Sequence, residues 1–337
     1  MLGVTIKTLA TALNLSTATV SKALSDSYDI SKETKLRVRK LAEELNYVPD
    51  LYASSLRKRK SHTIALVIPE VADSFFSQAI NGIEAVAREK GYHVLIYLTH
   101  ESYEREKAIL KDFQSGRVDG VLISVTAETI AATHIQELTD KDIPVVFFDR
   151  ICEEMNTAKI TTDDFNSGYM ATKHLIDCGC SNIALLSVSN SLSISNQRMN
   201  GYMQALKNCG LNFEEENIIY CTQDTQDNQA VLKKLMTGKN RPDGIIATVE
   251  KLTYSIYFVC RELQINIPGQ VKIVGFSNLQ TALLLNPSLT TVTQPAFEMG
   301  STAATLLFKG LNKKKFDLKK ESIVIPSVLE VRNSTVG

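Results

Sequence analysis

The feature that most restricts the fold of this chain is a regular alternation of short apolar segments and amphipathic segments, which begins at Thr63. Strands are expected at Thr63–Ile68, His93–Leu98, Gly120–Val125, Pro144–Phe148, Ile183–Ser187, Asn217–Cys221, Gly244–Ala247 and Lys272–Gly275. Helices are expected near Phe75–Lys90, Tyr103–Ser115, Ile130–Lys141, Ser167–Asp177, Gln197–Cys209, Gln229–Thr237 and Leu252–Leu263. Strands that are apolar throughout and alternate with helices are typical of parallel sheets covered on both faces. The sequence therefore predicts an α/β body with doubly wound parallel sheets.

Two turn-and-strand segments occupy matching places in this alternation. They are Val118-Asp119-Gly120-Val121-Leu122-Ile123 and Pro242-Asp243-Gly244-Ile245-Ile246-Ala247. The match indicates two similar lobes. Because ligands of open α/β sheets bind beyond the carboxyl ends of the strands, we expect a ligand site in a cleft between the lobes.

Three short helices are predicted ahead of this body, within residues 5–45. Thr5, Ser16 and Ser31 are good N-cap residues, and apolar residues at helical spacing follow each of them. Asn14 stands between the first two helices, at a turn position that needs a residue tolerating positive φ. Two short helices joined by a tight turn and closed by a third make a helix-turn-helix.

The second of these helices, Thr17–Leu24, has a small and polar outward face that contains Thr17, Ala18, Ser21 and Lys22. Small side chains let a helix enter the major groove of DNA, and lysine can donate to guanine or to phosphate. Residues 1–60 hold 11 Lys and Arg against 6 Asp and Glu, whereas the remainder holds 26 against 31. A basic segment ahead of an acidic body favours a polyanionic partner. A protein-interaction module with a solvated face is the alternative.

Composition disfavours several other classes of protein. No apolar run approaches the roughly 18–20 residues of a transmembrane helix, and the first residues do not resemble a secretory signal peptide. The six cysteines are scattered, as is typical of reduced thiols, so we expect a cytoplasmic protein with no membrane partner. The chain lacks a phosphate-binding Gly-Lys-Ser/Thr loop and a His-Glu-x-x-His motif, and Cys178-Gly179-Cys180 does not have the spacing of a zinc site. We expect no catalytic residue, no metal and no cofactor.

The first sixty residues also resemble a known family. Val4-Thr5-Ile6-Lys7-Thr8-Leu9-Ala10 and Leu15-Ser16-Thr17-Ala18-Thr19-Val20-Ser21-Lys22-Ala23-Leu24 are similar to the DNA-binding headpiece of lactose-repressor (LacI/GalR-type) regulators, and the resemblance runs along essentially the whole chain. Asn14 stands where Gly is usual, and Lys22 stands where Arg is usual. Lysine keeps the charge but lacks the planar fork with which arginine reads guanine.

The segment Leu45-Asn46-Tyr47-Val48-Pro49-Asp50, continued through Ala53 to Leu56, resembles the hinge of the same family. Residues 50–56 are too few to be helical alone, because helix nucleation is costly. The resemblance implies that this segment folds on DNA against the same segment of a second subunit, and that Leu56 wedges into the minor groove and bends the duplex. A satisfied linker side chain is the alternative for Leu56.

The resemblance also implies the domain organisation. Residues 1–48 form a small all-α helix-turn-helix DNA-binding headpiece, and residues 49–61 form a hinge helix and linker. The effector-binding domain has the two-lobed fold of periplasmic sugar-binding proteins, with residues 62–160 and 291–320 in its N-terminal lobe and residues 161–290 and 321–337 in its C-terminal lobe. The chain is then expected to cross between the lobes near residues 160, 291 and 321.

Candidate DNA contacts come from the headpiece and the hinge. They are Thr5, Ser16, Thr17, Ala18, Thr19, Ser21, Lys22, Ser31, Tyr47, Ala53 and Leu56. Candidate effector contacts lie mostly on loops after predicted strands, where carboxylates accept hydrogen bonds from hydroxyls and aromatic rings can stack on a sugar. They are Asp73, Phe75, Phe76, Ser124, Asp149, Asn196, Arg198, Val249, Glu250, Ser277, Asn278 and Gln294. At least one of the two phenylalanine rings is expected in the core, and Asp149 could instead pair with Arg150.

Arg198 stands where the family carries its ligand-facing arginine, whose donors suit vicinal hydroxyls or a carboxylate. Two usual sugar-binding positions differ in this chain. The family commonly has Asn-Asp where Val249-Glu250 stands, and an aspartate first where Ser277-Asn278 stands. These changes predict an effector more apolar or more anionic than a plain hexose, or a cleft that no longer binds a small molecule.

We therefore expect a homodimeric regulator of transcription, most simply a repressor, whose affinity for DNA responds to a small molecule. Its partners would be double-stranded DNA with a near-palindromic operator and a carbohydrate-like effector. A cytoplasmic solute-binding receptor is one alternative, but the complete headpiece speaks against it. An enzyme on a similar fold is another, and no catalytic constellation in the sequence supports it.

Overall fold

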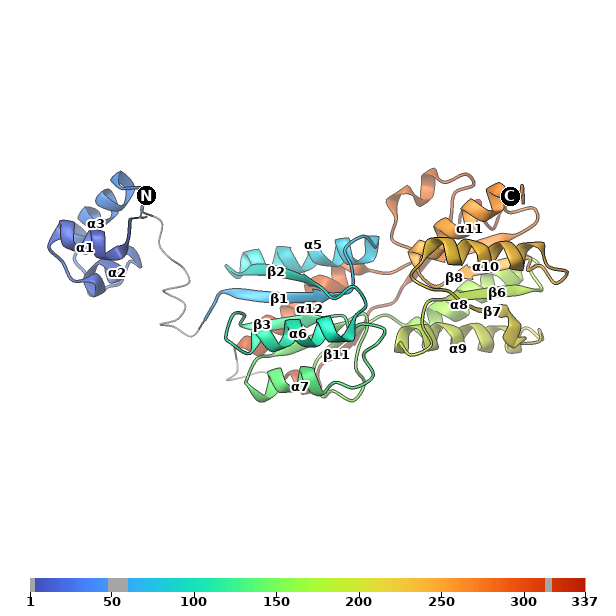
Figure 1. Cartoon of the computed structure of the whole chain (residues 1–337), viewed down its shortest axis with the longest axis horizontal. Helices are drawn as coiled ribbons and strands as arrows, with labels where there is room; N and C mark the ends of the chain where they lie inside the picture. The colour runs from blue at the N-terminus through green and yellow to red at the C-terminus, as the bar shows by residue number, and fades with distance from the viewer. Residues whose placement is uncertain (1–3, 48–59, 313–316, 337) are drawn as a thin grey trace. The chain divides into compact units, whose positions relative to one another are not determined.

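The computed structural model describes residues 4–47, 60–312 and 317–336 (Figure 1). The chain divides into two compact units, Met1–Ser61 and His62–Gly337, which contain the headpiece and the body. Within the described ranges, no helix is both long and apolar enough to span a membrane.

The described part of the headpiece is a bundle of three helices, α1 (Ile6–Leu13), α2 (Thr17–Leu24) and α3 (Lys32–Glu44). Fully buried Leu9, Val20 and Val38 come one from each helix and form the centre of its small core. Asn14 ends α1 with a φ of 53°, in the left-handed region that the sequence predicts for this turn. The helix-turn-helix geometry is therefore confirmed.

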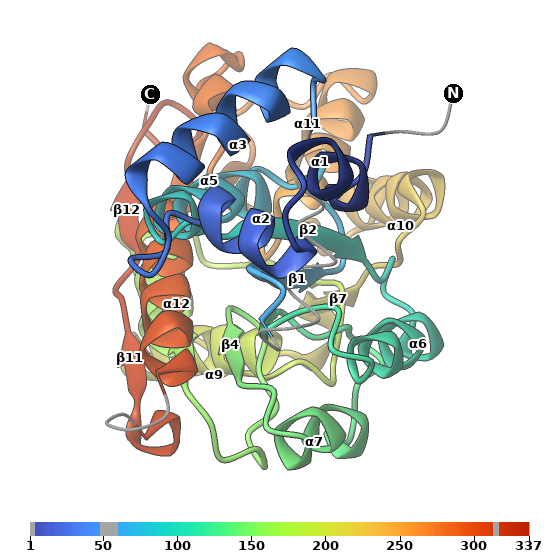
Figure 2. The same ribbon diagram turned by 90° about the vertical axis from the view of Figure 1, so that its left-hand side faces the viewer.

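The described part of the body contains two sheets, and the first is entirely parallel. Its described strands are β1 (Thr63–Ile68), β2 (His93–Leu98), β3 (Gly120–Ile123), β4 (Val145–Phe148), β5 (Lys159–Thr161) and β11 (Ser322–Val324), in the spatial order β11-β5-β4-β3-β1-β2. The helices on it are α5 (Ser74–Glu89), α6 (Tyr103–Phe113), α7 (Thr133–Asp140) and α12 (Ala296–Leu311). Helices α5 and α12 cover one face of this sheet, and α6 and α7 cover the other (Figure 2). We call this assembly the first lobe.

The second lobe repeats the arrangement. Its described strands are β6 (Ile183–Ser187), β7 (Ile218–Tyr220), β8 (Gly244–Ala247), β9 (Lys272–Phe276), β10 (Thr290–Thr293) and β12 (Val328–Glu330), in the spatial order β12-β10-β9-β8-β6-β7. Its helices are α8 (Asp164–Asp177), α9 (Ser193–Asn208), α10 (Thr225–Thr237) and α11 (Glu250–Glu262). Helices α8 and α9 cover one face and α10 and α11 the other (Figure 1). Only the edge strand β12 departs from the predicted parallel pattern, because it runs antiparallel to β10.

Short 3-10 helices complete the described elements of the body. They are η1 (Glu215–Asn217), η2 (Gln280–Leu284) and η3 (Leu318–Lys320).

The chain passes between the lobes three times: after β5, after β10 and after β11. The first crossing follows residue 161, close to the predicted position. The second and third follow residues 293 and 324, later than the predicted residues 291 and 321. The reason is that β10 pairs with β9 and β11 pairs with β5, so each short strand belongs to the sheet of the segment before its crossing. Residues 291–293 thus lie in the second lobe and residues 322–324 in the first, the reverse of the predicted assignment.

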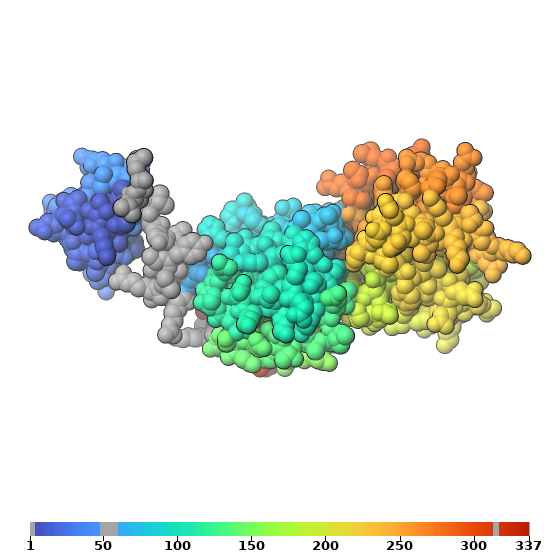
Figure 3. All heavy atoms as spheres, in the orientation of Figure 1, coloured from blue at the N-terminus to red at the C-terminus, as the bar shows by residue number. Residues whose placement is uncertain are grey.

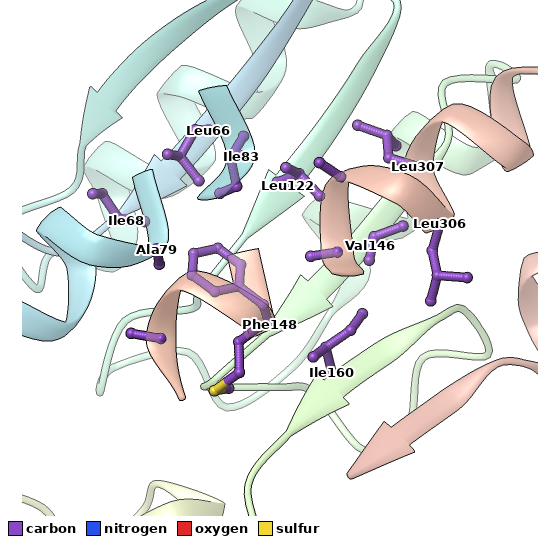
Figure 4. Close-up of a cluster of buried hydrophobic side chains, with 14 of the residues drawn as sticks. Leu66, Ile68, Ala79, Ile83, Leu122, Val146, Phe148, Ile160, Leu306 and Leu307 are labelled. Carbon is purple, nitrogen blue, oxygen red and sulfur yellow. The ribbon is translucent and has the colours of Figure 1, made fainter. Parts of the chain in front are cut away.

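Buried strand residues point alternately to the two faces of each sheet, so each sheet has a core on both faces. In the first lobe, Leu66, Leu122 and Phe148 face α5 and α12 and pack with Ile83 and Leu307 (Figure 4). Their sequence neighbours on the same strands contribute to the separate core under α6 and α7. This two-sided burial is the physical reason for the continuously apolar strands.

One pair of helices in each lobe packs backbone against backbone at glycine. A Cβ added to Gly300 of α12 would lie 2.2 Å from the carbonyl oxygen of Ala79 on α5. A Cβ added to Gly168 of α8 would lie 2.1 Å from the carbonyl oxygen of Arg198 on α9. Both distances are far below van der Waals contact, so these positions require a residue without a side chain. We call the second contact the α8–α9 seam.

Candidate nucleic-acid interface and effector cleft

Helix α2 presents the predicted face to solvent. Val20 and Ala23 are fully buried against the other headpiece helices, while Thr17, Ala18 and Lys22 are exposed. Ser21 and Thr19 are half-buried at the edges of this face. Because the buried residues fix the rotation of α2, the small side chains are the ones that a major groove would meet.

The hydroxyls of Thr5, Ser16 and Ser31 hold the starts of the three helices. Each accepts a hydrogen bond from the backbone N–H three residues later, at 3.4, 3.0 and 3.2 Å, so the three predicted N-caps are confirmed. All three residues are exposed. Helix N-termini carry unpaired N–H groups and partial positive charge, so the same positions suit phosphate oxygens.

Lys22 forms an ion pair with Asp29. The hydroxyl of Ser27 also donates to the Asp29 carboxylate, at 2.5 Å. The hydrogen bond from Lys22 is the largest cause that lowers the pKa of Asp29 to about 2. The ammonium group is thus positioned by a partner inside the headpiece, and a guanine or phosphate acceptor would have to compete with this carboxylate or share the lysine with it.

The remaining candidate DNA contacts fall at the end of the headpiece and beyond it. Tyr47 is half-buried against the headpiece core, and its backbone N–H donates to the carbonyl oxygen of Ala42 at 2.8 Å. Ala53 and Leu56 lie outside the described residues.

A small cavity lies between the lobes, at the carboxyl ends of strands from both sheets. Its volume is about 30 Å³. It is lined by Asp73, Phe75, Phe76, Asp149, Arg150, Ile194, Arg198, Thr248, Val249, Glu250, Phe276, Ser277, Asn278 and Gln294. The two lobes meet along a narrow seam in the space-filling view (Figure 3). The cleft therefore lies where the sheet topology predicts it, in a closed form with room for about two water molecules.

Arg198 lies at the centre of the second lobe's side of the cavity. Its Nε and Nη2 atoms lie 2.7 Å from Oδ1 of Asp164, and Nη1 donates to the carbonyl oxygen of Thr248 at 2.6 Å. The guanidinium group also stacks on the ring of Phe276, with 4.2 Å between Cζ and the ring centroid. Both partners of the ion pair are buried. Arg198 is thus fixed by its own lobe before any ligand arrives.

On the first lobe's side, Asp149 follows β4 and is buried. Burial is the largest cause that raises the pKa of Asp149 to about 6. Arg150 pairs mainly with Glu101, at 2.7 Å from Nη1 to Oε1, whereas its Nε is 3.9 Å from Oδ2 of Asp149. The Ser124 hydroxyl donates to Oδ2 of Asp149 at 3.3 Å. Asp149 therefore lines the cavity and also forms a long ion pair with Arg150.

Phe75 and Phe76 both line the cavity and both belong to the first lobe's core. Their rings meet edge to face, with 5.3 Å between centroids. Phe76 also contacts Phe148 edge to face, and Arg150 lies 6.0 Å above its ring. The two rings thus form an apolar wall held in place by the core.

Two acidic side chains meet near the start of α5. Asp73 caps this helix by accepting the N–H of Phe75 at 2.9 Å. Burial, followed by the nearby charge of Glu250, raises the pKa of Asp73 to about 7. Glu250 begins α11 in the second lobe and accepts the N–H of Ser74 at 3.1 Å, across the cleft.

Two predicted effector contacts do not line the cavity. Ser124 lies behind Asp149 and supports it, as its hydrogen bond shows. Asn196 is half-buried on α9 and points elsewhere, because residues two apart on a helix lie on different faces. Ile194 lines the cavity instead, since it is four residues from Arg198 and shares its face.

Sequence reasoning missed four lining residues: Arg150, Ile194, Thr248 and Phe276. Three of them adjoin predicted contacts along the chain. The signal for Ile194 was the helical spacing to Arg198, which becomes visible only when α9 is known to begin at Ser193.

Two family models match the chain. The model described as bacterial regulatory proteins, lacI family, matches residues 5–50, and the one described as periplasmic binding proteins and sugar binding domain of LacI family matches residues 61–333. The chain belongs to the LacI family. The headpiece resemblance seen in the sequence is thereby confirmed.

Individual relatives of this LacI-family protein match along nearly the whole chain. The ribose operon repressor of Bacillus subtilis (strain 168) is 30% identical over 334 residues, which cover 98% of each chain. A LacI family transcriptional regulator from Enterococcus faecium with bound ribose is 26% identical, with a TM-score of 0.72 over 81% of this chain and 98% of that one. The lac repressor dimer bound to operator and the anti-inducer ONPF has a TM-score of 0.86 at 19% identity, over 99% and 100% of the two chains, and shows the shared fold.

These matches decide the class of protein. The LacI-family chain is a DNA-binding transcriptional regulator of the repressor type, with a helix-turn-helix headpiece and a periplasmic-binding-protein-like body. The relatives are regulators and not enzymes, in agreement with the sequence analysis.

Proposed function

We propose that this regulator is a homodimeric repressor that acts in the cytoplasm on a near-palindromic operator, and that a neutral, hydroxyl-rich small molecule of the sugar class controls it from the cleft. The observation that carries the proposal is the charge distribution around the cavity. Three carboxylates, Asp73, Asp149 and Glu250, line the cavity, whereas both lining arginines are already paired with other acids.

This charge distribution favours hydroxyl groups over anionic ones as the groups recognised. Carboxylates accept hydrogen bonds from hydroxyls, and the rings of Phe75 and Phe76 offer an apolar wall for the face of a sugar ring. An anionic ligand would add a like charge to a site that already raises the pKa of Asp73 and of Asp149. The sequence favours an effector more apolar or more anionic than a plain hexose, or an empty cleft, and the charges around the cavity lead us to propose a neutral effector. The bound ribose of the Enterococcus faecium relative supports this class.

Exposed apolar side chains support the dimer. Leu95 and Ile96 are 38% and 44% exposed on β2, the edge strand of the first sheet. In the second lobe, Tyr254, Leu283 and Leu284 are exposed to 63%, 64% and 81%. Large apolar side chains in such numbers suit a protein interface. A two-fold dimer carries two headpieces related by symmetry, which is why the operator is expected to be a near-palindrome.

Within the dimer, we propose that the exposed face of α2 reads the major groove, with Thr17, Ala18 and Lys22 as its centre. Thr5, Ser16 and Ser31 place helix N-termini toward phosphates. The hinge residues Ala53 and Leu56 would contact the minor groove between the two half-sites. Effector binding would change the angle between the lobes and thereby the DNA affinity.

Two measurements test the proposal. Operator affinity measured from 50 to 200 mM salt is expected to fall by about 10³–10⁵-fold if six to ten phosphates are neutralised, and a flat salt response would contradict DNA binding by the headpiece. Thermal unfolding against a panel of neutral, amino and acidic sugars tests the effector class. A neutral sugar at about a hundred times its dissociation constant is expected to stabilise the body by about 2.7 kcal/mol. Stabilisation by acidic sugars alone would refute the charge argument.

A further inference from the structure

We infer that the Glu250 side chain occupies part of the effector site when no effector is bound. Its carboxylate accepts hydrogen bonds from both lobes and so holds the lobes closed. An effector that enters the cleft displaces it. The inference rests on the proposed function in taking this cleft as the effector site. It adds a residue that competes with the effector and so helps to select it.

Four donors from two lobes converge on the Glu250 carboxylate. From the first lobe, the backbone N–H of Ser74 donates to Oε1 at 3.1 Å, and the Ser74 hydroxyl donates to Oε2. From the second lobe, the Ser277 hydroxyl and the backbone N–H of Asn278 donate to Oε2 at 2.8 and 3.3 Å. The same hydroxyls and backbone N–H groups can donate to the hydroxyl oxygens of a neutral sugar once Glu250 is displaced.

The Ser74 side of this site depends on Glu250. Ser74 is the first residue of the 16-residue helix α5, so its N–H has no acceptor within the helix. The N-cap residue Asp73 does not satisfy it, because its carboxylate accepts the N–H of Phe75 instead. The positive end of the helix dipole adds to the attraction for the Glu250 carboxylate. Without Glu250, the closed cleft would leave this N–H unpaired.

Glu250 is well placed to reach across. It is the first residue of α11, and the N-cap residue Val249 provides no side-chain hydrogen bond to that helix. Its hydrogen bonds go instead to Ser74, Ser277 and Asn278, outside α11. Val249-Glu250 is also one of the two places where the sequence departs from the common family pattern, which gives the cross-lobe contact a sequence basis.

A second contact supports the same closure one turn further along α5. The amide nitrogen of Gln78 donates to the carbonyl oxygen of Asn278 at 2.9 Å, and the Asn278 amide nitrogen donates to Oε1 of Gln78 at 3.3 Å. The first two turns of α5 thus contact the second lobe at two successive points, Glu250 and Asn278.

In the closed cleft, one nitrogen of Arg150 donates no hydrogen bond to the described residues. This nitrogen is Nε, and the Asp149 carboxylate with which it forms an ion pair is 3.9 Å away. The arginine side chain is only 9% exposed and lines the cavity. A buried donor without a hydrogen bond is costly, so the site gains when a ligand supplies an acceptor. The cavity of about 30 Å³ is far smaller than the roughly 300 Å³ of a small ligand pocket. An effector therefore enters only when the lobes separate, which breaks the hydrogen bonds between Ser74 and Glu250.

Hydrogen exchange on the full-length protein, without DNA or effector, tests the inference. Electron-transfer fragmentation of peptides spanning residues 70–82 and 272–284 resolves the amides of Ser74 and Asn278, the two backbone donors to Glu250. We expect both to be protected in the wild type and to exchange at least tenfold faster in Glu250→Ala, with the amides of the α11 interior unchanged. Glu298→Ala is the matched control, because Glu298 lies in the first turn of α12 and is exposed. Glu250→Gln, which keeps the shape of the side chain, provides a second variant.

The outcomes separate clearly. Faster exchange confined to these two amides and their neighbours in Glu250→Ala or Glu250→Gln supports the inference. Rapid exchange of Ser74 in the wild type overturns it, as does equal exchange in wild type and both variants. Acceleration spread over α11 and its sheet would also overturn it, because Glu250 would then stabilise its own lobe. Since neither operator nor sugar is present, failure here leaves the proposed function to be judged by its own tests.

Discussion

Replacing Asp73 by asparagine is expected to remove a pH-dependent destabilisation of the body. The pKa of Asp73 is about 7 in the folded protein against 3.8 for the unperturbed side chain, a difference of about three units. Each unit corresponds to 1.36 kcal/mol, so the folded body pays at most about 4 kcal/mol above pH 7 to keep this carboxylate ionised. A raised pKa means that the folded state holds the proton more tightly, so the stability contributed by the protonated form is lost as the pH rises through 7.

The side chain of Asp73 is only partly buried, and it faces the charged Glu250, so solvent screening reduces that ceiling. We expect the difference in unfolding free energy between Asp73→Asn and wild type to grow by about 1–2 kcal/mol from pH 5 to pH 8, in favour of the variant. Asparagine is as good an N-cap as aspartate, so the cap of α5 is preserved. Urea unfolding followed by circular dichroism at several pH values measures the difference. Asp163→Asn, at the exposed N-cap of α8, is the control. A difference that is constant with pH, or that favours the wild type at pH 8, would refute the reasoning.

Three further predictions concern stability. Ser16→Ala is expected to destabilise the headpiece by about 1 kcal/mol through loss of the α2 cap, and an unchanged headpiece transition in calorimetry would contradict this. Asp164→Asn is expected to lower the unfolding free energy of the body by about 3–5 kcal/mol in urea, because it leaves the buried charge of Arg198 unpaired. The control Glu330→Gln removes the surface partner of Arg332 and is expected to lower it by less than about 1 kcal/mol. Gly300→Ala is expected to cost about 3 kcal/mol or more by forcing α12 away from α5, and a melting temperature equal to that of the wild type would show that the two helices separate freely.

The regular part of the fold could be predicted because buried segments show apolar runs or apolar periodicity in the local sequence. The bounds of β1, β2, β6, β8 and α2 agree with the prediction residue for residue. Strands β1, β6 and β8 are apolar and buried, and α2 is a short capped helix, so each carries a local signal, whereas β2 is an apolar edge strand that is partly exposed. Helix starts were less accurate. Helices α8, α9 and α10 begin three or four residues before the predicted positions, because their first turns are mostly polar and hold at most one large apolar residue each.

Four short strands could not be predicted. Strands β5, β10, β11 and β12 have three or four residues each, and they exist because of pairing with strands distant in sequence. Missing them also displaced two of the three predicted crossings between the lobes. Pairing between remote segments has no local pattern to detect.

The cleft was predicted in its location and in most of its residues, because loops after parallel strands converge at one edge of each sheet. What each residue does there could not be predicted. Whether Arg198 is free or paired depends on Asp164, which is 34 residues away in sequence. The reach of Glu250 to Ser74 depends on the distance between two lobes, which no local pattern reports.

The α8–α9 seam joins Arg198 to helix α8 as one rigid unit. Gly168 fits against the backbone of Arg198, and one turn before it on the same helix Asp164 holds the arginine's side chain. Backbone and side chain of Arg198 are therefore clamped by the same helix, so lobe motion carries the pair as a unit and cannot reorient one member alone. Substitutions in the loops around the cavity can therefore change ligand specificity without moving Arg198. A substitution at Gly168 would instead displace the backbone of Arg198 and with it the guanidinium group. Asp164 and Gly168 do not line the cavity, yet together they restrict the positions that the Arg198 side chain can take there.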